Sequence, residues 1–320
     1  MINSETSPLP KKPRDHGGGI DAAIANWGGT RESWLDLSTG INPVPYDVAD
    51  FPADAWTALP DKRARENLIA AARTFWKVPE ELAILAAPGA SAVIARIPAL
   101  VAAGRVDIPV PTYNEHAAAF EAQGWKITSD APDARVLVHP NNPTGRLWTA
   151  SDLTAPFMVI DESFCDICPK ASLIEEARKP GRIVLKSFGK FWGLAGARLG
   201  FAIGDPALIE KLAEFIGPWA VSGPALSLGT QALQDEAWAS KTRARLAEDA
   251  RRLDALLRSK GAEVAGGADL FRLYEVEDAA KWQETLAQNH VWSRIFPYSK
   301  TFLRLGLPAP DRWDQLEAAL

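Results

Sequence analysis

Short apolar runs recur through the middle of the chain, separated by stretches with the spacing of amphipathic helices. The runs are rich in Val, Ile and Leu and show little polar alternation, which is typical of parallel strands that are covered on both faces. We expect strands at residues 106–110, 135–139, 157–160, 183–186 and 199–203. Apolar residues at helical spacing predict helices at 61–77 and 92–103. The two patterns together predict an α/β core.

The pattern changes after Pro218. A long charged helix is expected at 237–260, followed by strands at 268–276, 291–296 and 301–305, a helix at 279–289, and a last helix from Asp311. This mixture is typical of a smaller α+β unit. We therefore predict an N-terminal arm at residues 1–40, a large domain at 41–218 and a small C-terminal domain at 219–320.

Composition and charge exclude several classes of protein. The 320 residues are 47% hydrophobic with a net charge of −5, so the basic excess of a nucleic-acid-binding surface is missing. The sequence has no apolar stretch of the roughly 18 residues that a membrane span needs and no signal-peptide core. Cys165 and Cys168 form a C-x-x-C pair without two further zinc ligands, so we expect ordinary thiols and no metal. A cytoplasmic protein that binds neither nucleic acid nor membrane is expected.

Reactive side chains follow three of the predicted strands. The strand at 135–139 runs into Asn-Asn-Pro-Thr-Gly at 141–145, the next ends at Asp161, and the strand at 183–186 leads to Ser-Phe-Gly-Lys at 187–190. Each alone has a structural explanation, such as a turn, a helix N-cap or a surface lysine. In open α/β sheets, however, ligands bind beyond the carboxyl ends of the strands. Three such ends together predict a site at one edge of the sheet.

These groups match the needs of pyridoxal 5'-phosphate (PLP). Lys190 offers the amine for a Schiff base, Asp161 a carboxylate to face the pyridine nitrogen, and Asn142 an amide for the ring's 3'-oxygen. Tyr113 is the candidate to cover the ring. The cofactor phosphate would be held by backbone, hydroxyl and guanidinium groups of Ala90, Ser91, Ser187 and Arg198. We predict catalytic roles for Lys190, Asp161 and Tyr113.

The same motifs, in this order and spacing, resemble those of fold-type I PLP enzymes of the aspartate aminotransferase superfamily. The chain is most similar to the histidinol-phosphate aminotransferase-like branch, through residues 141–145, 159–162 and 187–200. The resemblance covers nearly the whole chain. It implies a PLP-dependent transferase fold with a mostly parallel sheet flanked by helices, a smaller α+β C-terminal domain, and a homodimer.

The N-terminal region resembles the start of the threonine-phosphate decarboxylases of cobalamin biosynthesis. The similar segments are His-Gly-Gly at 16–18 and Leu-Asp-Leu-Ser-Thr-Gly-Ile-Asn-Pro at 35–43. The resemblance implies decarboxylation of a phosphorylated amino acid, L-threonine O-3-phosphate, to (R)-1-aminopropan-2-yl phosphate. It implies that His16 binds the substrate phosphate and Arg304 the carboxylate, with Asn42 and Asn142 as further substrate contacts. Arg31 and Arg294 are open candidates for the phosphate.

Two positions depart from the pattern of the family. Phe164 stands where a tyrosine commonly hydrogen-bonds the cofactor's 3'-oxygen, and this change favours decarboxylation over transamination. Leu59 stands where a tyrosine often reaches the cofactor phosphate of the partner subunit.

Two other functions stay open at this point. One is an aminotransferase for histidinol phosphate or an aromatic amino acid, because sequence does not display which Cα bond is held for cleavage. The other is a non-catalytic regulator or scaffold built on the same fold. The intact Lys190, Asp161 and Asn142 argue against the second.

Overall fold

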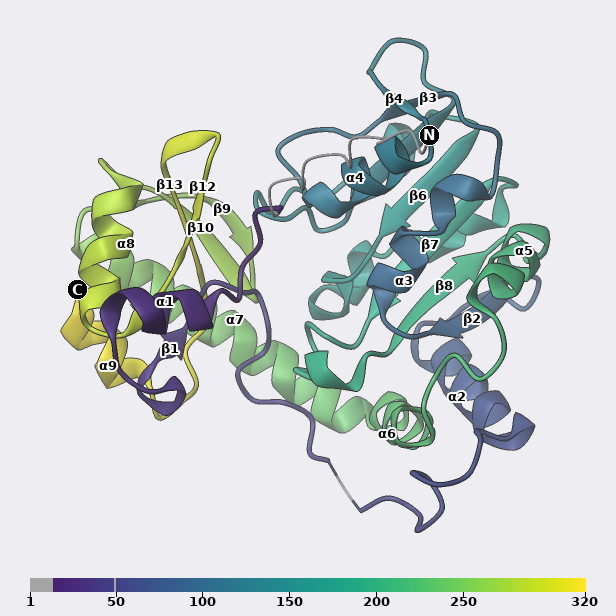
Figure 1. Cartoon of the computed structure of the whole chain (residues 1–320), viewed down its shortest axis with the longest axis horizontal. Coiled ribbons are helices and arrows are strands. Elements are labelled where there is room, and N and C mark those ends of the chain that lie inside the picture. The colour runs from purple at the N-terminus through teal and green to yellow at the C-terminus, as the bar shows by residue number, and fades with distance from the viewer. Residues whose placement is uncertain (1–13, 49) are drawn as a thin grey trace, which may run out of the picture.

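The computed structural model describes residues 14–48 and 50–320; residues 1–13 of the predicted arm and residue 49 lie outside it. Its larger sheet has seven strands in the order β2-β8-β7-β6-β5-β3-β4 (Figure 1). These strands are β2 (Ala83–Ala87), β3 (Arg105–Asp107), β4 (Lys126–Ile127), β5 (Ala134–Val138), β6 (Phe157–Asp161), β7 (Arg182–Ser187) and β8 (Gly200–Gly204). Strand β8 is antiparallel to both of its neighbours, β2 and β7, and the other strand pairs are parallel, so the predicted mostly parallel sheet is confirmed.

Helices cover both faces of this sheet. One face carries α3 (Ala90–Ile94), α4 (Asn114–Ala122) and α5 (Pro206–Ile216), and the other carries α2 (Lys62–Phe75), α6 (Gly223–Gln234) and α7 (Glu236–Ser259). Successive strand residues alternate between the two cores: Val159 packs with the first set and Ile160 with the second. This burial on both sides explains why the strand sequences are continuously apolar.

The helix expected at 61–77 is confirmed as α2. It begins where the Asp61 carboxylate accepts a hydrogen bond from Ala64 N (2.6 Å), and it buries Leu68 and Ala72. The helix expected at 92–103 is wrong in its extent. α3 ends at Ile94 and only a 3-10 turn follows at Ile97–Ala99, because Pro98 has no N–H for a longer helix.

A second sheet lies toward the C-terminus. Its antiparallel strands β9 (Glu263–Ala268), β10 (Phe271–Glu275), β12 (Arg294–Phe296) and β13 (Ser299–Gly306) have the order β12-β13-β10-β9 and contact α8 (Ala279–Gln288) and α7. The strand expected at 268–276 is instead a hairpin of β9 and β10. The strand expected at 291–296 is broken at Ser293 into β11 (Val291–Trp292) and β12. The last helix, α9, spans Trp313–Ala319.

Part of the predicted arm folds against these C-terminal elements. Helix α1 (Ile20–Trp27) is followed by β1 (Leu35–Asp36), which pairs in parallel with β11. Ile20, Ala23 and Trp34 pack against Ala287 of α8. The division into a large domain at 41–218 and a small domain at 219–320 stays a prediction. Within residues 14–48 and 50–320, no helix has both the length and the apolar character needed to cross a bilayer.

Further 3-10 turns connect the elements. They lie at Arg31–Ser33, Ala150–Asp152, Cys165–Ile167, Pro169–Ala171, Ile174–Arg178 and Ala195–Ala197.

Candidate active site

The carboxyl ends of β5, β6 and β7 deliver their polar groups to one cavity. This inner cavity, of about 120 Å³, is lined by all eight residues predicted to hold a cofactor: Ala90, Ser91, Tyr113, Asn142, Asp161, Ser187, Lys190 and Arg198. Neighbouring parallel strands end side by side, which explains how residues 48 positions apart in sequence meet. The structure places these eight residues around one cavity, and their roles toward a cofactor stay predictions.

Asp161 is buried at the end of β6 and is held by its neighbours. His116 Nε2 lies 2.8 Å from one carboxylate oxygen, and the Ser163 hydroxyl and N–H donate to the other at 2.5 and 3.0 Å. Burial acts to raise the pKa of Asp161, but His116 and Ser163 outweigh it and hold the pKa below its usual range. His116 was not predicted from the sequence, because a single histidine in a short helix has no spacing signal.

Lys190 lies in the turn after β7, with Nζ 5.4 Å from the centre of the Phe164 ring. Burial, followed by the positive charge of Arg304, lowers the pKa of Lys190 to about 8. A larger share of the amine is therefore neutral near neutral pH than in an exposed lysine. Its backbone is fixed too, since its carbonyl accepts from Asn42 N at 3.0 Å.

The part of the inner cavity lined by Arg198 suits a phosphate. Arg198 packs against Gly89 so closely that a Cβ at Gly89 would lie 2.6 Å from Arg198 Nη2. The hydroxyl-bearing Ser91 and Ser187 line the same cavity. With an ionised carboxylate, an amine of lowered pKa and this cationic end, the donor set fits PLP.

An outer cleft of about 860 Å³ adjoins the inner cavity. The two share the side chains of Tyr113, Asn142, Phe164 and Lys190. Burial, then the Glu115 carboxylate, raises the pKa of Tyr113 to about 12, so its phenol is neutral. Phe164 packs edge-on against Phe271 at 4.9 Å between ring centres, in the place where the resemblance led us to expect a tyrosine.

Arg304, on β13, lines the cleft and is buried. Its guanidinium donates to Asn142 Oδ1 and to the Ser38 carbonyl. Its Nε has no hydrogen-bond partner within the described residues. Burial and the nearby Arg294 lower the pKa of Arg304 to about 10. A buried cation with a free donor beside Lys190 favours an anionic ligand group.

The mouth of the cleft carries further charge. His16 Nε2 lies 2.8 Å from Glu115 Oε1, and Arg294 lines the same space. Arg31, the other open candidate for the phosphate, does not line the cleft; its side chain is 72% exposed and lies 3.8 Å from Asp21.

Asn42 is placed differently from its predicted role. It is buried, does not line either cavity, and its amide donates to the Phe191 carbonyl at 2.8 Å. Its oxygen accepts from Val44 N and from Arg245 at 2.6 Å. These bonds tie the Asn42 side chain to the turn that carries Lys190, and its role as a substrate contact stays a prediction.

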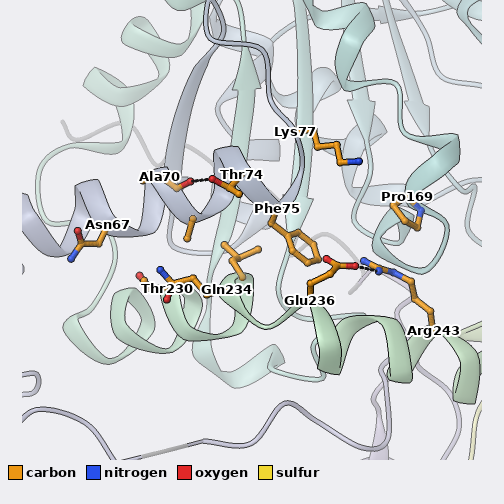
Figure 2. Close-up of a pocket in the computed structure, with 12 residues that line it drawn as sticks. Asn67, Ala70, Thr74, Phe75, Lys77, Pro169, Thr230, Gln234, Glu236 and Arg243 are labelled. Carbon is orange, nitrogen blue, oxygen red and sulfur yellow. Dashed lines mark hydrogen bonds and ion pairs between the residues drawn. The ribbon is translucent and has the colours of Figure 1, made fainter.

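A larger hollow elsewhere does not carry this chemistry. About 970 Å³ in volume, it lies between α2, α6 and α7, with the side chains shown in Figure 2. Its internal polar contacts are Thr74 to the Ala70 carbonyl and Arg243 to Glu236 (2.8 Å). Since none of the predicted site residues lines it, we place the candidate active site in the inner cavity and outer cleft.

The C-x-x-C pair lies near a buried polar cluster. Both cysteines are free thiols, and Cys165 comes within 4.8 Å of ligand atoms of His139 and Glu162. Both imidazole nitrogens of His139 are already bonded, to Trp148 N and the Ala171 carbonyl, and Glu162 pairs with Lys186 at 2.7 Å. This cluster packs next to the ends of β6 and β7, because Glu162 directly follows β6 and Lys186 lies near the end of β7.

Comparisons with known proteins agree with this geometry. Residues 128–319 match the family model described as aminotransferase class I and II. A threonine-phosphate decarboxylase of Sinorhizobium sp is 41% identical over 93% of this chain and 94% of its own. One of Pseudomonas aeruginosa is 38% identical over 96% of this chain and 97% of its own. A histidinol-phosphate aminotransferase of Pectobacterium atrosepticum is 32% identical but matches only 43% of this chain and 46% of its own.

The fold also matches a solved structure. The histidinol-phosphate aminotransferase of Sinorhizobium meliloti, solved in complex with pyridoxal-5'-phosphate, superimposes with a TM-score of 0.81 over 100% of this chain and 97% of its own. The sequence identity is 18%, so this likeness concerns the fold.

Proposed function

This chain belongs to the class I and II aminotransferase family, and from that premise we propose that it decarboxylates L-threonine O-3-phosphate to (R)-1-aminopropan-2-yl phosphate in cobalamin biosynthesis. The observation that carries the proposal is the 41% identity to a threonine-phosphate decarboxylase over nearly the full length of both chains. The cleft supports it, because cationic groups for two anionic ends of a substrate lie beside one lysine.

The enzyme is PLP-dependent, and PLP supplies a sink for the electron pair of the bond that breaks. In our proposal Lys190 would hold the cofactor, Asp161 would pair with its pyridine nitrogen, and Asn142 would donate to its 3'-oxygen. Ser91, Ser187 and Arg198 would hold its phosphate, with the backbone of Ala90. His116 keeps the Asp161 carboxylate ionised, which the pyridine nitrogen requires in order to stay protonated.

The chain's own groups orient the substrate. Arg304, which lines the cleft and already holds the Asn142 amide, would receive the carboxylate. His16 and Arg294, at the mouth of the cleft, receive the phosphate. Fixing both ends restricts rotation about the Cα bonds, which selects the bond to be broken. Lys190 Nζ then delivers a proton to Cα; its pKa of about 8 lies close to working pH, as general acid–base catalysis requires.

The deciding experiment supplies L-threonine O-3-phosphate to the purified holoenzyme. We expect release of carbon dioxide and formation of one equivalent of aminopropanyl phosphate, with no requirement for a 2-oxo acid. Transfer of the amino group to 2-oxoglutarate without carbon dioxide would overturn the proposal and support the aminotransferase alternative.

The aminotransferase alternative has weaker support, since the histidinol-phosphate aminotransferase relative matches less than half of the chain. The ionised Asp161 and the lowered pKa of Lys190 argue against a non-catalytic regulator or scaffold, because perturbed pKa values of this kind are typical of catalytic sites.

We further propose that the protein is a cytoplasmic homodimer. Large apolar side chains are exposed on two connecting segments: Val48, Trp56 and Leu59 before α2, and Trp219 between α5 and α6. Exposed aromatic groups of this size are typical of an interface. Leu59 lies on this surface and does not line the cleft of its own chain.

The proposed cytoplasmic location is supported by the cysteines. The free thiols of Cys165 and Cys168 suit a reducing compartment.

A further inference from the structure

Residues 14–18, here named the N-terminal strap, cross the mouth of the outer cleft. On one side the strap is bound to α4: Arg14 donates to both carboxylate oxygens of Glu115 at 2.6 and 2.8 Å, and Asn114 donates to the Asp15 carbonyl at 2.8 Å. In Figure 1 the strap is the purple start of the described chain, between α4 and the smaller sheet.

On the other side the strap is bound to β12 through Asp15. Arg294 donates to both carboxylate oxygens of Asp15 at 2.6 Å each, and also to the His16 carbonyl at 2.7 Å. The Arg294 side chain is only 13% exposed, whereas Asp15 is 43% exposed. Asp15 therefore covers the guanidinium with an anion that comes from the chain itself.

The surrounding charge explains why an anion is held there. Arg294 is close enough to Arg304 to lower the pKa of the latter, and Lys190 lies in the same cleft. Among the described residues that line the cleft, Asp15 contributes the only carboxylate. Apart from Lys190, which would hold the cofactor, the two guanidinium groups of Arg294 and Arg304 thus face one acid, and the balance favours a more highly charged anion.

A carboxylate and a phosphate bind a guanidinium through the same two-pronged geometry. Asp15 occupies the fork formed by Nη1 and Nη2 of Arg294, so a ligand phosphate that binds at this fork would take the positions that Asp15 holds. A phosphate dianion can displace the carboxylate, while a neutral side chain cannot and would leave the strap closed over the mouth.

We propose that Asp15 is a specificity-determining residue, an internal anion that occupies Arg294 until the anionic end of the ligand displaces it. This inference rests on the proposed phosphorylated substrate. Asp15 then lowers the affinity for every anion at this end of the cleft, and only ligands with sufficient charge overcome it.

The test compares the holoenzyme with its Asp15→Asn variant, using inorganic phosphate as the probe in calorimetry. Asn keeps the shape of Asp15 but removes its charge, so we expect the variant to bind phosphate about fivefold more tightly, the upper end of what a partly exposed ion pair contributes. Asp21→Asn is the matched control, because that carboxylate is 97% exposed and outside the cleft; its phosphate affinity stays at the wild-type value.

A double-mutant cycle with Arg294→Gln locates the effect. In the Arg294→Gln background, Asp15→Asn should no longer tighten phosphate binding. Unchanged or weaker phosphate binding by the single Asp15→Asn variant, or a gain that persists without Arg294, would overturn the inference. Phosphate binding does not depend on which Cα bond is cleaved, so these outcomes are separate from the carbon dioxide assay that tests the proposed function.

Discussion

At the scale of single residues, the environment of Lys190 sets when its amine is reactive. The neutral amine is the nucleophile that captures PLP, and its fraction rises as the pH rises through the pKa. With that pKa at about 8, the rate of PLP capture by apoenzyme should rise with pH and level off above about pH 8. Stopped-flow absorbance measures it.

Arg304→Gln provides the internal check on this pH profile. Arg304 is the second cause of the lowered pKa after burial, so its removal should move the levelling point to higher pH. Arg31→Gln, an exposed arginine outside the cleft, should leave the profile unchanged. A wild-type profile that rises through pH 10 would contradict the prediction.

His116 is the second prediction at this scale. His116→Asn removes the 2.8 Å contact from a buried carboxylate, and a hydrogen bond to a charged group contributes about 1.5–3 kcal/mol. We expect PLP to be retained roughly 10- to 100-fold less tightly and turnover to fall, measured by equilibrium dialysis and initial rates. His290→Asn is the control, because its left-handed backbone (φ 57°) tolerates asparagine and it lies outside both cavities. Equal retention in both variants would reject the role of His116.

The sequence predicted site residues where a motif follows a strand end. Lys190, Asp161 and Asn142 come from three segments of that kind, and the structure brings them together. Asn42, by contrast, lies in a matching motif but forms bonds within the protein. His116 and Asp15 were missed, because their importance depends on a partner 45 or 279 residues away and a local pattern does not contain it.

At the scale of elements, β8 positions the start of α3 by close approach. A Cβ at Gly200 would lie 2.4 Å from Ala90 N, so Gly200→Ala must push away the turn that carries Ala90 and Ser91. We expect a PLP affinity lower by tenfold or more with α-helix content retained, measured by cofactor titration and circular dichroism. Gly196→Ala is the matched control, since nothing lies within 4 Å of its added Cβ; similar losses in both variants would contradict the prediction.

Helices and strands were predictable where the apolar pattern of a helix extends over many residues or where a strand is buried on both faces. Helix α7 and strands β5, β6 and β7 appear within one or two residues of expectation. The direction of β8 was not predictable, because an apolar run does not encode the orientation of its neighbours. The hairpin of β9 and β10 was missed since Gly266 and Gly267 interrupt the apolar pattern, and β9 packs its glycines against Thr144.

At the scale of the whole molecule, the exposed surface before α2 tests the homodimer. Trp56 is 74% exposed, and its ring lies nearly perpendicular to that of Phe51 with 6.0 Å between the ring centres. A tryptophan buried at an interface contributes about 2 kcal/mol or more, and a homodimer contains two copies, so Trp56→Ser should weaken self-association by at least roughly 30-fold for each copy in sedimentation velocity. Leu147→Ser, at another exposed apolar position, is the control. A wild-type protein that sediments as a monomer at micromolar concentration would rule out the dimer.

The shared wall between the two cavities bears on inhibitor design. Tyr113, Asn142, Phe164 and Lys190 border both, so whatever fills the inner cavity becomes the floor of the outer cleft. A drug-like phosphonate could therefore bind in the outer cleft without displacing a cofactor from the inner cavity. Asp161, Ser187 and Arg198 of the shared motifs line the inner cavity alone, whereas Asp15, Arg294 and Tyr298 border the cleft alone. Selectivity over other members of the family should therefore be sought at that rim.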